Sequence, residues 1–353
     1  MKKLSLLIAF LILTVLQVFA PTTDKSLTTR AEEDGGTLKD SSVATKIKID
    51  GVNTDPVKVS KENHIYNLSI NNKPCITVKD GTRLVVECWD ALEGRSKEYF
   101  DNKTPNSEIN ANPATGPIFI EGALPGNTLE IEIHNIGLSR FGFMQLRKNQ
   151  FIENAARENV YIETEVAGNQ LLYNGRKMPV QPMIGVIGTA SPNEISCKEA
   201  GDNGGNMDTR TIKKGSKVLL PVLVEGALLA IGDVHAVMGD GEVFGQGVEI
   251  GAEVEITVRV RKDLNIQRPM IISDDRIACI ASNPNILTAK DQVIKDMGRY
   301  LVNACGFSSI DASALIAFYG NLHFCQVVNP QKTVRMEIEK QYIKLFEHKV
   351  LPF

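Results

Sequence analysis

The chain has 353 residues, of which 43% are hydrophobic and 23% are charged, and its formal net charge is -3. This composition is typical of a globular protein with a substantial core, in one large domain or two smaller ones. One Trp, 6% aromatic residues and no excess of positive charge leave little for phosphate contacts or base stacking, so we expect no nucleic-acid partner.

The N-terminal segment has the features of a secretory signal peptide. Lys2 and Lys3 precede an apolar stretch that ends at Ala20, where small residues fit a cleavage site. The stretch is short for a membrane-spanning helix, so we expect residues 1–20 to be removed and no stable membrane insertion to remain; an uncleaved anchor is the alternative. Residues 21–42 are polar and predict a disordered leader. We therefore expect the protein in the secretory pathway or outside the cell, or in the periplasm of a bacterium.

Four copies of one pattern, a glycine turn followed by apolar residues, predict strands in the middle of the chain. The glycines are Gly81, Gly126, Gly215 and Gly251. After the second and fourth of them the apolar residues lie two apart, which is the period of a strand with one buried face. After the third the apolar run is continuous, as in a strand covered on both faces. Few helical stretches intervene, so we predict a mainly β fold with a sandwich-type body over residues 43–265.

The remaining residues, 266–353, are predicted to form a mixed α/β portion that packs on the β body. The first predicted helix places its apolar residues on one stripe, starts near Thr288 and is followed by Gly306. The predicted elements are two helices followed by two strands, over residues 288–304, 308–319, 322–328 and 333–339.

Six cysteines are compatible with disulfides in an exported protein. None of them has the C-x-x-C spacing of a zinc knuckle or redox motif. Cys88 and Cys325 lie in apolar, strand-like runs, so free thiols buried in the core are the alternative for these two.

The densest polar cluster follows the most apolar predicted strand. Asp233 and His235 are two residues apart, so in an extended chain their side chains point to the same face; Asp240 and Glu242 repeat this spacing after a short turn. One imidazole and several carboxylates at the end of a buried strand are suitable ligands for a divalent metal of the zinc type. The structural alternative is that the aspartates stabilise glycine-containing turns and the histidine is an ordinary interior residue.

Two further segments carry candidate residues. The loop from residue 201 to 208 is rich in glycine, so its backbone can approach a ligand closely, while Asn206 and Asp208 offer an amide oxygen and a carboxylate. Glu121 ends an apolar strand, and a carboxylate in an apolar setting can carry protons. A surface turn and a strand-end carboxylate are the structural alternatives. The motifs G-x-S-x-G, H-E-x-x-H and G-x-G-x-x-G are absent, which excludes the usual serine hydrolases, zincins and dinucleotide enzymes.

These polar segments, in this order, resemble the acetamidase/formamidase family. The resembling stretches are residues 112–133, 204–208, 220–242 and 325–336, and the third carries a Gly-Asp-x-His-Ala run that ends in Gly-Asp-Gly-Glu. The resemblance implies a mainly β sandwich-type fold with an added α/β portion, often dimeric, that hydrolyses short amides to a carboxylate and ammonia and is associated with bound metal. Asn112 stands where many relatives carry His, and Met238 stands where Gln is common.

The resemblance and the residue chemistry together give a candidate site. The predicted metal ligands are Asp208, Asp233, His235 and Asp240. The predicted catalytic residues, which would move protons, are Glu121 and Glu242. The predicted substrate-binding residues are Asn112, Gly205 and Asn206. We expect zinc as the metal, with calcium as the alternative, and a homodimer.

The predicted function is metal-assisted hydrolysis of short linear amides of the formamide and acetamide type. Two alternatives remain from the sequence. The departure at Asn112 and the expected export are compatible with a secreted, non-catalytic binding protein on the same fold. The other alternative keeps the hydrolase chemistry but makes the substrate a cyclic amide, a lactam.

Overall fold

The computed structural model describes residues 55–148, 158–346 and 351–352. The predicted signal peptide and disordered leader, residues 1–20 and 21–42, lie outside these ranges. No helix in the described ranges combines the length and the apolar character that a membrane crossing requires.

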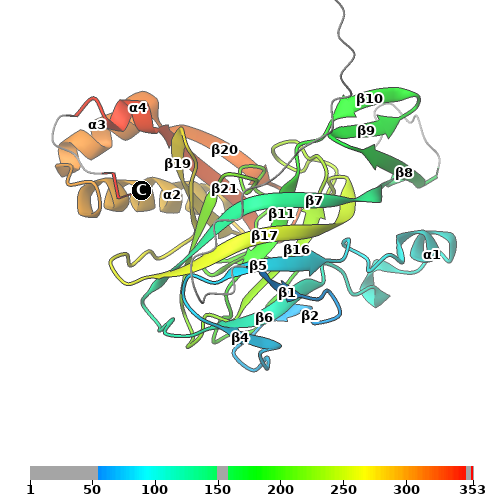
Figure 1. The fold of residues 1–353 in the computed structure, drawn as a ribbon. Coiled ribbons are helices and arrows are strands. Elements are labelled where there is room, and N and C mark those ends of the chain that lie inside the picture. Colours follow the sequence, from blue (N-terminus) through cyan, green and yellow to red (C-terminus); the bar gives the residue numbers. More distant parts are fainter. Residues whose placement is uncertain (1–54, 149–157, 347–350, 353) are drawn as a thin grey trace, which may run out of the picture. The chain divides into compact units, whose positions relative to one another are not determined.

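Strands dominate the described chain, which confirms the predicted mainly β class (Figure 1). In chain order they are β1 Val57–Val59, β2 His64–Ile65, β3 Asn67–Leu68, β4 Ile76–Val78, β5 Arg83–Cys88, β6 Ala114–Ile120, β7 Thr128–Leu146, β8 Val160–Ala167, β9 Gln170–Tyr173, β10 Arg176–Pro179, β11 Met183–Gly188, β12 Ile195–Ser196, β13 Ala200–Gly201, β14 Gly204–Asn206, β15 Lys217–Pro221, β16 Leu229–His235, β17 Glu249–Arg261, β18 Met270–Ile272, β19 Arg276–Asn283, β20 Asn321–Gln326 and β21 Lys332–Glu339. The helices are α1 Ser96–Asp101, α2 Ile286–Asn303, α3 Ser309–Tyr319 and α4 Lys340–Ile343, with a 3-10 helix at Asn106–Glu108.

Apart from the short β3–β12 pair, the strands form one hydrogen-bonded sheet that curls into two layers around a shared core. The strand order of the first layer is β1, β5, β17, β7, β15. The strand order of the second layer is β4, β6, β16, β11, β14, β13. Ile131 of β7, Val254 of β17 and Ile231 of β16 are fully buried in this core. The body is therefore sandwich-like, as predicted, because alternate residues of both layers face the same interior.

The two layers are joined at one ladder pair. Among the described residues, β16 of the second layer pairs with β17 of the first at a single register position, His235 opposite Glu249. Elsewhere β16 pairs with β6 and β11, and β17 pairs with β5 and β7. The junction therefore places a histidine and a glutamate side by side at a point where the layers separate.

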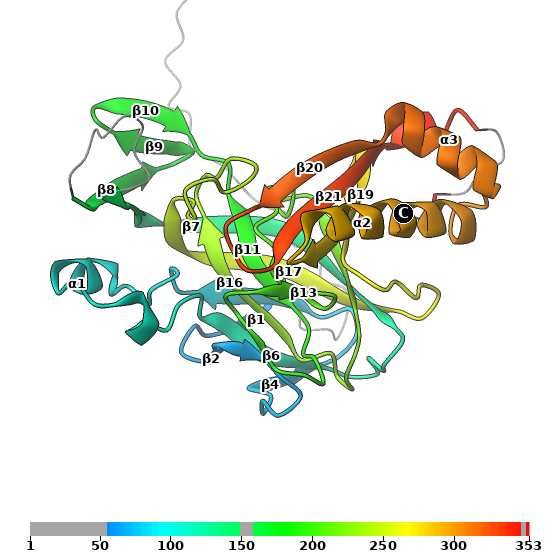
Figure 2. The same cartoon turned by 180° about the vertical axis from the view of Figure 1, so that it is seen from behind.

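The C-terminal α/β portion continues the first layer. β18 pairs with β15, and β19, β21 and β20 follow in that order. Figure 2 shows α2 lying along this extension, and Val293, Met297 and Leu301 of α2 are buried against it. Leu219 of β15 packs in this second core, whereas its neighbour Leu220 packs in the first. One strand thus contributes to both cores, which holds the C-terminal portion on the body.

Both predicted helices are present, with shifted starts. α2 begins at Ile286, two residues before the predicted start, because the side chain of Asn285 accepts hydrogen bonds from the backbone N–H groups of Leu287 and Thr288. α3 begins after Ser308, whose hydroxyl oxygen accepts a hydrogen bond from the backbone N–H of Asp311.

The predicted turn at Gly251 is wrong, because this residue lies inside β17, which already begins at Glu249. A Cβ at Gly251 would lie 3.3 Å from the backbone oxygen of Cys88, so the glycine allows close approach of the chain rather than a turn. The other three glycines, Gly81, Gly126 and Gly215, have the positive φ of turns. All six cysteines are free in the described structure; Cys88 and Cys325 are buried, as the apolar runs around them predict.

Candidate active site

Five ionisable side chains meet at the junction of the two layers. Asp233 and His235 end β16, Glu249 begins β17, Asp208 follows β14, and Glu242 lies on the loop between β16 and β17. All five are buried, with 6% exposure or less. Their ligand atoms form two overlapping sets, each lying within 4.8 Å of one another: Asp208, Asp233 and His235, and His235, Glu242 and Glu249. The structure therefore brings together four of the residues predicted from the sequence, together with Glu249.

Two glycines make this close approach possible. A Cβ on Gly185 of β11 would lie 2.7 Å from a carboxylate oxygen of Asp208 and 2.7 Å from one of Asp233. A Cβ on Gly247 would lie 2.7 Å from Cγ and Nδ1 of His235. Since side chains do not come this close to a Cβ, any other residue at these two positions would displace the cluster.

His235 is held by charge rather than by well-aligned hydrogen bonds. Its Nε2 lies 3.2 Å from Oε2 of Glu249 and 3.6 Å from Oδ1 of Asp233. Neither ring nitrogen, nor Oε2 of Glu249, makes a hydrogen bond of good geometry with a described residue. Burial alone would lower the pKa of His235, but the charges of Glu249 and Asp233 outweigh burial and raise that pKa well above its ordinary value.

Burial raises the pKa values of three carboxyl groups in the cluster. The pKa of Asp208 is raised well above its ordinary value, first by burial and then by the charges of Glu242 and Asp233. Burial is also the largest cause for Glu242 and Glu249, whose pKa values are raised to about 8. In the absence of a cation, Glu242 and Glu249 therefore carry protons at neutral pH for most of the time, because neighbouring buried carboxylates repel one another's charge.

The buried histidine nitrogens and carboxylate oxygens fit a divalent metal. The donor atoms of each set lie within 4.8 Å of one another, and both ring nitrogens of His235 and Oε2 of Glu249 lack a hydrogen bond of good geometry with a described residue, as donors to such an ion would. Asp208, Asp233, His235, Glu242 and Glu249 are the residues that would hold it.

The raised pKa values make the stability of the metal-free protein depend on pH. Between the ordinary value of 4.5 and about 8, Glu242 and Glu249 bind more protons in the folded protein than in the unfolded chain. The free energy of unfolding therefore falls as pH rises through this window. We expect urea unfolding of the chelated protein to show this decline, and a shallower decline for Glu242→Gln. A free energy of unfolding that stays constant or rises across the window would contradict the raised pKa values.

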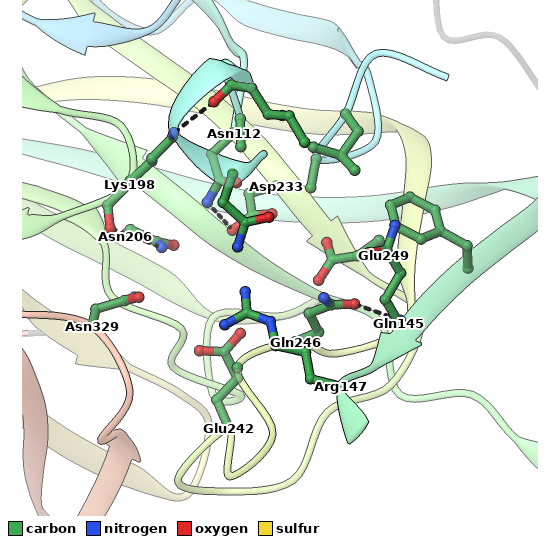
Figure 3. A pocket seen from close by; sticks show the side chains of 17 residues that line it. Asn112, Gln145, Arg147, Lys198, Asn206, Asp233, Glu242, Gln246, Glu249 and Asn329 are labelled. Carbon is green, nitrogen blue, oxygen red and sulfur yellow. Dashed lines mark hydrogen bonds between the residues drawn. The ribbon is translucent and has the colours of Figure 1, made fainter. Parts of the chain in front are cut away.

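A cavity of about 270 Å³ opens beside the cluster (Figure 3). The carboxyl groups of Asp233, Glu242 and Glu249 point into it from different elements. Asp208 and His235 are not in its wall and lie behind these carboxylates. The cavity therefore gives a small molecule access to the outer side of the cluster.

Three asparagines line the same cavity. Nδ2 of Asn112 donates to Oδ2 of Asp233 over 3.0 Å. The side-chain amide of Asn206 is oriented so that its nitrogen faces the carboxylates, where it donates to Oδ2 of Asp233 over 3.0 Å and to Asp208 over 3.1 Å. Its oxygen then accepts from Asn112 and Asn329, over 3.2 Å each. Asn112 and Asn206 were predicted from the sequence as substrate-binding residues, and the structure places both beside the carboxylates.

Three of the predicted site residues lie elsewhere. Glu121 is exposed and follows Ile120 at the opposite end of β6 from Ala114, which pairs with Gly232. Gly205 lies outside the cavity wall, and a Cβ there would meet the backbone oxygen of Glu199 at 2.5 Å, so this glycine serves the packing of β14.

Asp240 is the third. Its two carboxylate oxygens accept hydrogen bonds from Arg335 over 2.7 and 2.8 Å, and it does not join the buried cluster. The structure therefore does not support Asp240 as a metal ligand, because Arg335 binds both of its carboxylate oxygens. It does not support Glu121 as a catalytic residue, because that side chain is exposed and lies away from the cavity.

Several residues of the cavity were missed from the sequence. Glu249 is the most important, because it lies opposite His235 and its carboxyl group belongs to the cluster. The others are polar side chains around the cavity, Gln145, Arg147, Lys198, Gln246 and Asn329.

Comparisons with known proteins agree with this architecture. The model of the acetamidase/formamidase family matches residues 196–314. A predicted acetamidase/formamidase from Thermoanaerobacter tengcongensis superposes with a TM-score of 0.77 at 35% identity, covering 82% of this chain and 98% of that one. An acetamidase from Bacillus halodurans superposes with a TM-score of 0.75 at 35% identity, covering 82% of this chain and all of that one.

Among curated proteins, the acetamidase of Mycolicibacterium smegmatis is 50% identical over 42 residues, which is 12% of this chain and 10% of that protein. The match thus spans about a tenth of the length of the curated relative, whereas the two solved structures match along nearly their whole length. This chain belongs to the acetamidase/formamidase family.

Proposed function

We propose that the protein hydrolyses short linear amides, of the formamide and acetamide type, to a carboxylate and ammonia. The observation that carries this proposal is a buried cluster of carboxyl groups and a histidine, three of whose carboxyl groups line a cavity together with asparagines. Strongly shifted pKa values in a cavity are a mark of catalytic sites. Membership of the acetamidase/formamidase family supports the same chemistry.

We propose zinc as the metal, since an imidazole nitrogen combined with carboxylates is a donor set that zinc accepts, and calcium, which prefers oxygen alone, as the alternative. When bound, such an ion polarises the amide carbonyl and lowers the pKa of a coordinated water. The residues that would hold it are those of the buried cluster.

The chain's own residues supply orientation and proton transfer. Resonance makes the amide carbonyl a poor electrophile and the amide nitrogen a poor leaving group. Hydrolysis adds water to the carbonyl carbon and breaks the C–N bond, and the nitrogen takes up a proton and leaves as ammonia. The carboxyl group of Glu242 points into the cavity, so it is placed to pass that proton to the nitrogen. Asn112 and Asn206 are placed to hold the amide group of the substrate beside the carboxylates.

Neither alternative function is favoured. The family model and the two solved structures at 35% identity are named for amide hydrolases, which supports an enzyme over a non-catalytic binding protein. The two solved structures at 35% identity are named as a predicted acetamidase/formamidase and an acetamidase, which supports linear amides over lactams.

We also propose that the protein is exported and forms a homodimer. The N-terminal lysines and the apolar stretch that follows them support export. The resemblance to the family, whose members are often dimeric, supports the homodimer.

Ammonia release tests the proposed function. The purified protein is expected to release ammonia from formamide, acetamide or propionamide, to lose this activity on chelation, and to regain it when zinc is restored. Calcium in place of zinc identifies the alternative metal. A folded, metal-loaded protein that releases no ammonia from any of these amides would contradict the proposal.

A further inference from the structure

The C-terminal α/β portion contributes one side chain to the cavity. Asn329 lies in the turn between β20 and β21, and its side chain lines the cavity near Asn206 (Figure 3). Among the described residues, the other members of the cavity wall lie between Ala91 and Glu249, in the body. The wall is therefore completed by a segment that is distant in sequence from the rest of the site.

A buried glutamine holds the turn that carries Asn329. Gln326 is 0% exposed, and its Oε1 accepts hydrogen bonds from the backbone N–H groups of Val328 and Asn329 over 3.1 and 3.0 Å. Its Nε2 donates to the backbone oxygen of Gln331 and, over 3.1 Å, to the hydroxyl of Thr333. One side chain therefore contacts both arms of the turn, so the position of Asn329 is set before a ligand arrives.

The turn also contacts the loop that carries Glu242. The N–H of Gly241 donates to the backbone oxygen of Cys325 over 3.0 Å, and the N–H of Val327 donates to the backbone oxygen of Gly241 over 3.2 Å. Gly241 directly precedes Glu242 in the chain. Two parts of the cavity wall, the turn and the loop, are thus fixed against each other by backbone hydrogen bonds.

Asn329 helps to orient the side-chain amide of Asn206. An amide has one donating end and one accepting end, and Nδ2 of Asn329 donates to the oxygen of Asn206 over 3.2 Å. Asn112 donates to the same oxygen over the same distance, while the nitrogen of Asn206 donates to Asp208 and Asp233. A reversed Asn206 would place its oxygen against the carboxylates and its N–H groups against two other donors. The two asparagines that donate to Asn206 therefore fix which way round its amide lies.

We propose that Asn329 is a positioning residue, which acts through Asn206 to orient the substrate amide. This inference rests on the proposed amide hydrolysis, in which Asn112 and Asn206 hold that amide beside the carboxylates. In the described structure no hydrogen bond links the side chain of Asn329 to a carboxylate of the cluster, so we expect Asn329 to affect the substrate rather than the metal. The C-terminal portion is then part of the substrate site.

Two substitutions at Asn329 test the inference. Asn329→Ala removes the N–H that the oxygen of Asn206 accepts. We expect it to lower kcat/KM for acetamide by roughly tenfold, which corresponds to the loss of one hydrogen bond, and to leave the metal content unchanged. Asn329→Asp keeps the shape of the side chain but presents an oxygen to the oxygen of Asn206, so we expect a larger loss than with alanine. A side chain that only fills space would give the opposite order.

Two further variants are controls. Gln246 lines the same cavity, and its Oε1 accepts a hydrogen bond from the backbone N–H of Gln145 over 2.8 Å, which glutamate keeps. Gln246→Glu therefore measures the effect of an added negative charge in the cavity, and we expect Asn329→Asp to lower kcat/KM more than this. Asn321→Ala is the neutral control, because Asn321 begins β20, is exposed and lies outside the cavity wall; it should change neither kcat/KM nor metal content.

Ammonia release from acetamide and metal analysis of each dialysed variant give these values. A kcat/KM for Asn329→Ala within about twofold of that of the unchanged protein would overturn the inference and leave the proposed amide hydrolysis intact. An Asn329→Asp variant that is more active than Asn329→Ala, or no less active than Gln246→Glu, would also overturn it. Loss of metal from Asn329→Ala would do the same, since the residue would then act on the metal. No ammonia from the unchanged, metal-loaded protein would instead contradict the proposed function itself.

Discussion

Replacing His235 with alanine is expected to lower kcat/KM for amide hydrolysis by at least about 10³-fold and to reduce the metal that copurifies with the protein. His235 contributes the imidazole to both of the overlapping sets of possible metal ligands. Its removal leaves only the carboxyl groups of Asp208, Asp233, Glu242 and Glu249, without the imidazole nitrogen that a zinc site of this type uses. The fold should persist, because His235 joins the layers through its backbone pairing with Glu249, which alanine at this position keeps.

His134→Ala provides the matched control. Nε2 of His134 lies 2.7 Å from the hydroxyl of Thr257, and His134 does not line the cavity. This variant should keep both its metal and its turnover. Steady-state kinetics, metal analysis of the dialysed protein and circular dichroism on both variants check the prediction. Near-normal turnover by His235→Ala would contradict a role for the buried cluster in catalysis.

Local patterns in the sequence predict the elements of this fold but not its closure. Alternating apolar residues after Gly126 identify β7, and the stripe that includes Val293, Met297 and Leu301 identifies α2. The pairing of His235 with Glu249, which joins the layers, leaves no local mark, because register across a sheet is set by the packing of whole faces. Gly251 was misread for a related reason, since a glycine inside a long strand is needed when another backbone comes close.

The site residues that could be predicted from the sequence are those that differ most from the residues around them. Asp208, Asp233 and His235 are polar residues next to glycines and apolar runs, so they are conspicuous. Glu249 looks like Glu253 and Glu255, which alternate with apolar residues on the same strand, yet it is 4% exposed while the side chain of Glu253 is 60% exposed. The distinction depends on His235 across the ladder and could not be made from the strand alone.

Asp240 shows the opposite error. It is two residues from Glu242 and equally conspicuous, but Arg335, distant in sequence, binds both of its oxygens. No feature of the segment around Asp240 indicates this partner. The role of a carboxylate in a polar loop therefore depends on which residues, distant in sequence, contact it in the folded protein.

Arg335→Met is expected to lower the free energy of unfolding by about 3–5 kcal/mol. The side chain of Arg335 is 4% exposed, donates two hydrogen bonds to Asp240 and donates a third to Glu337 from Nε over 2.5 Å. Gly241 strengthens the same contact, since its N–H donates to the backbone oxygen of Cys325 over 3.0 Å. Removing the guanidinium leaves two carboxylates without this partner at the contact between the loop after β16 and the C-terminal portion.

Asp240→Asn separates this structural role from the metal ligand predicted by sequence. If Asp240 only anchors the loop, the variant loses stability, less than Arg335→Met because Arg335 keeps Glu337, and still binds metal in the same ratio as the unchanged protein. If Asp240 were a ligand, metal would be lost from Asp240→Asn but kept by Arg335→Met. Asp263→Asn is the control, since that residue pairs with Arg261 at the surface with its side chain 62% exposed, and it should change stability by about 1 kcal/mol or less. Urea unfolding and metal analysis on the three variants distinguish an anchor from a ligand, because only a ligand links the carboxylate to the metal content.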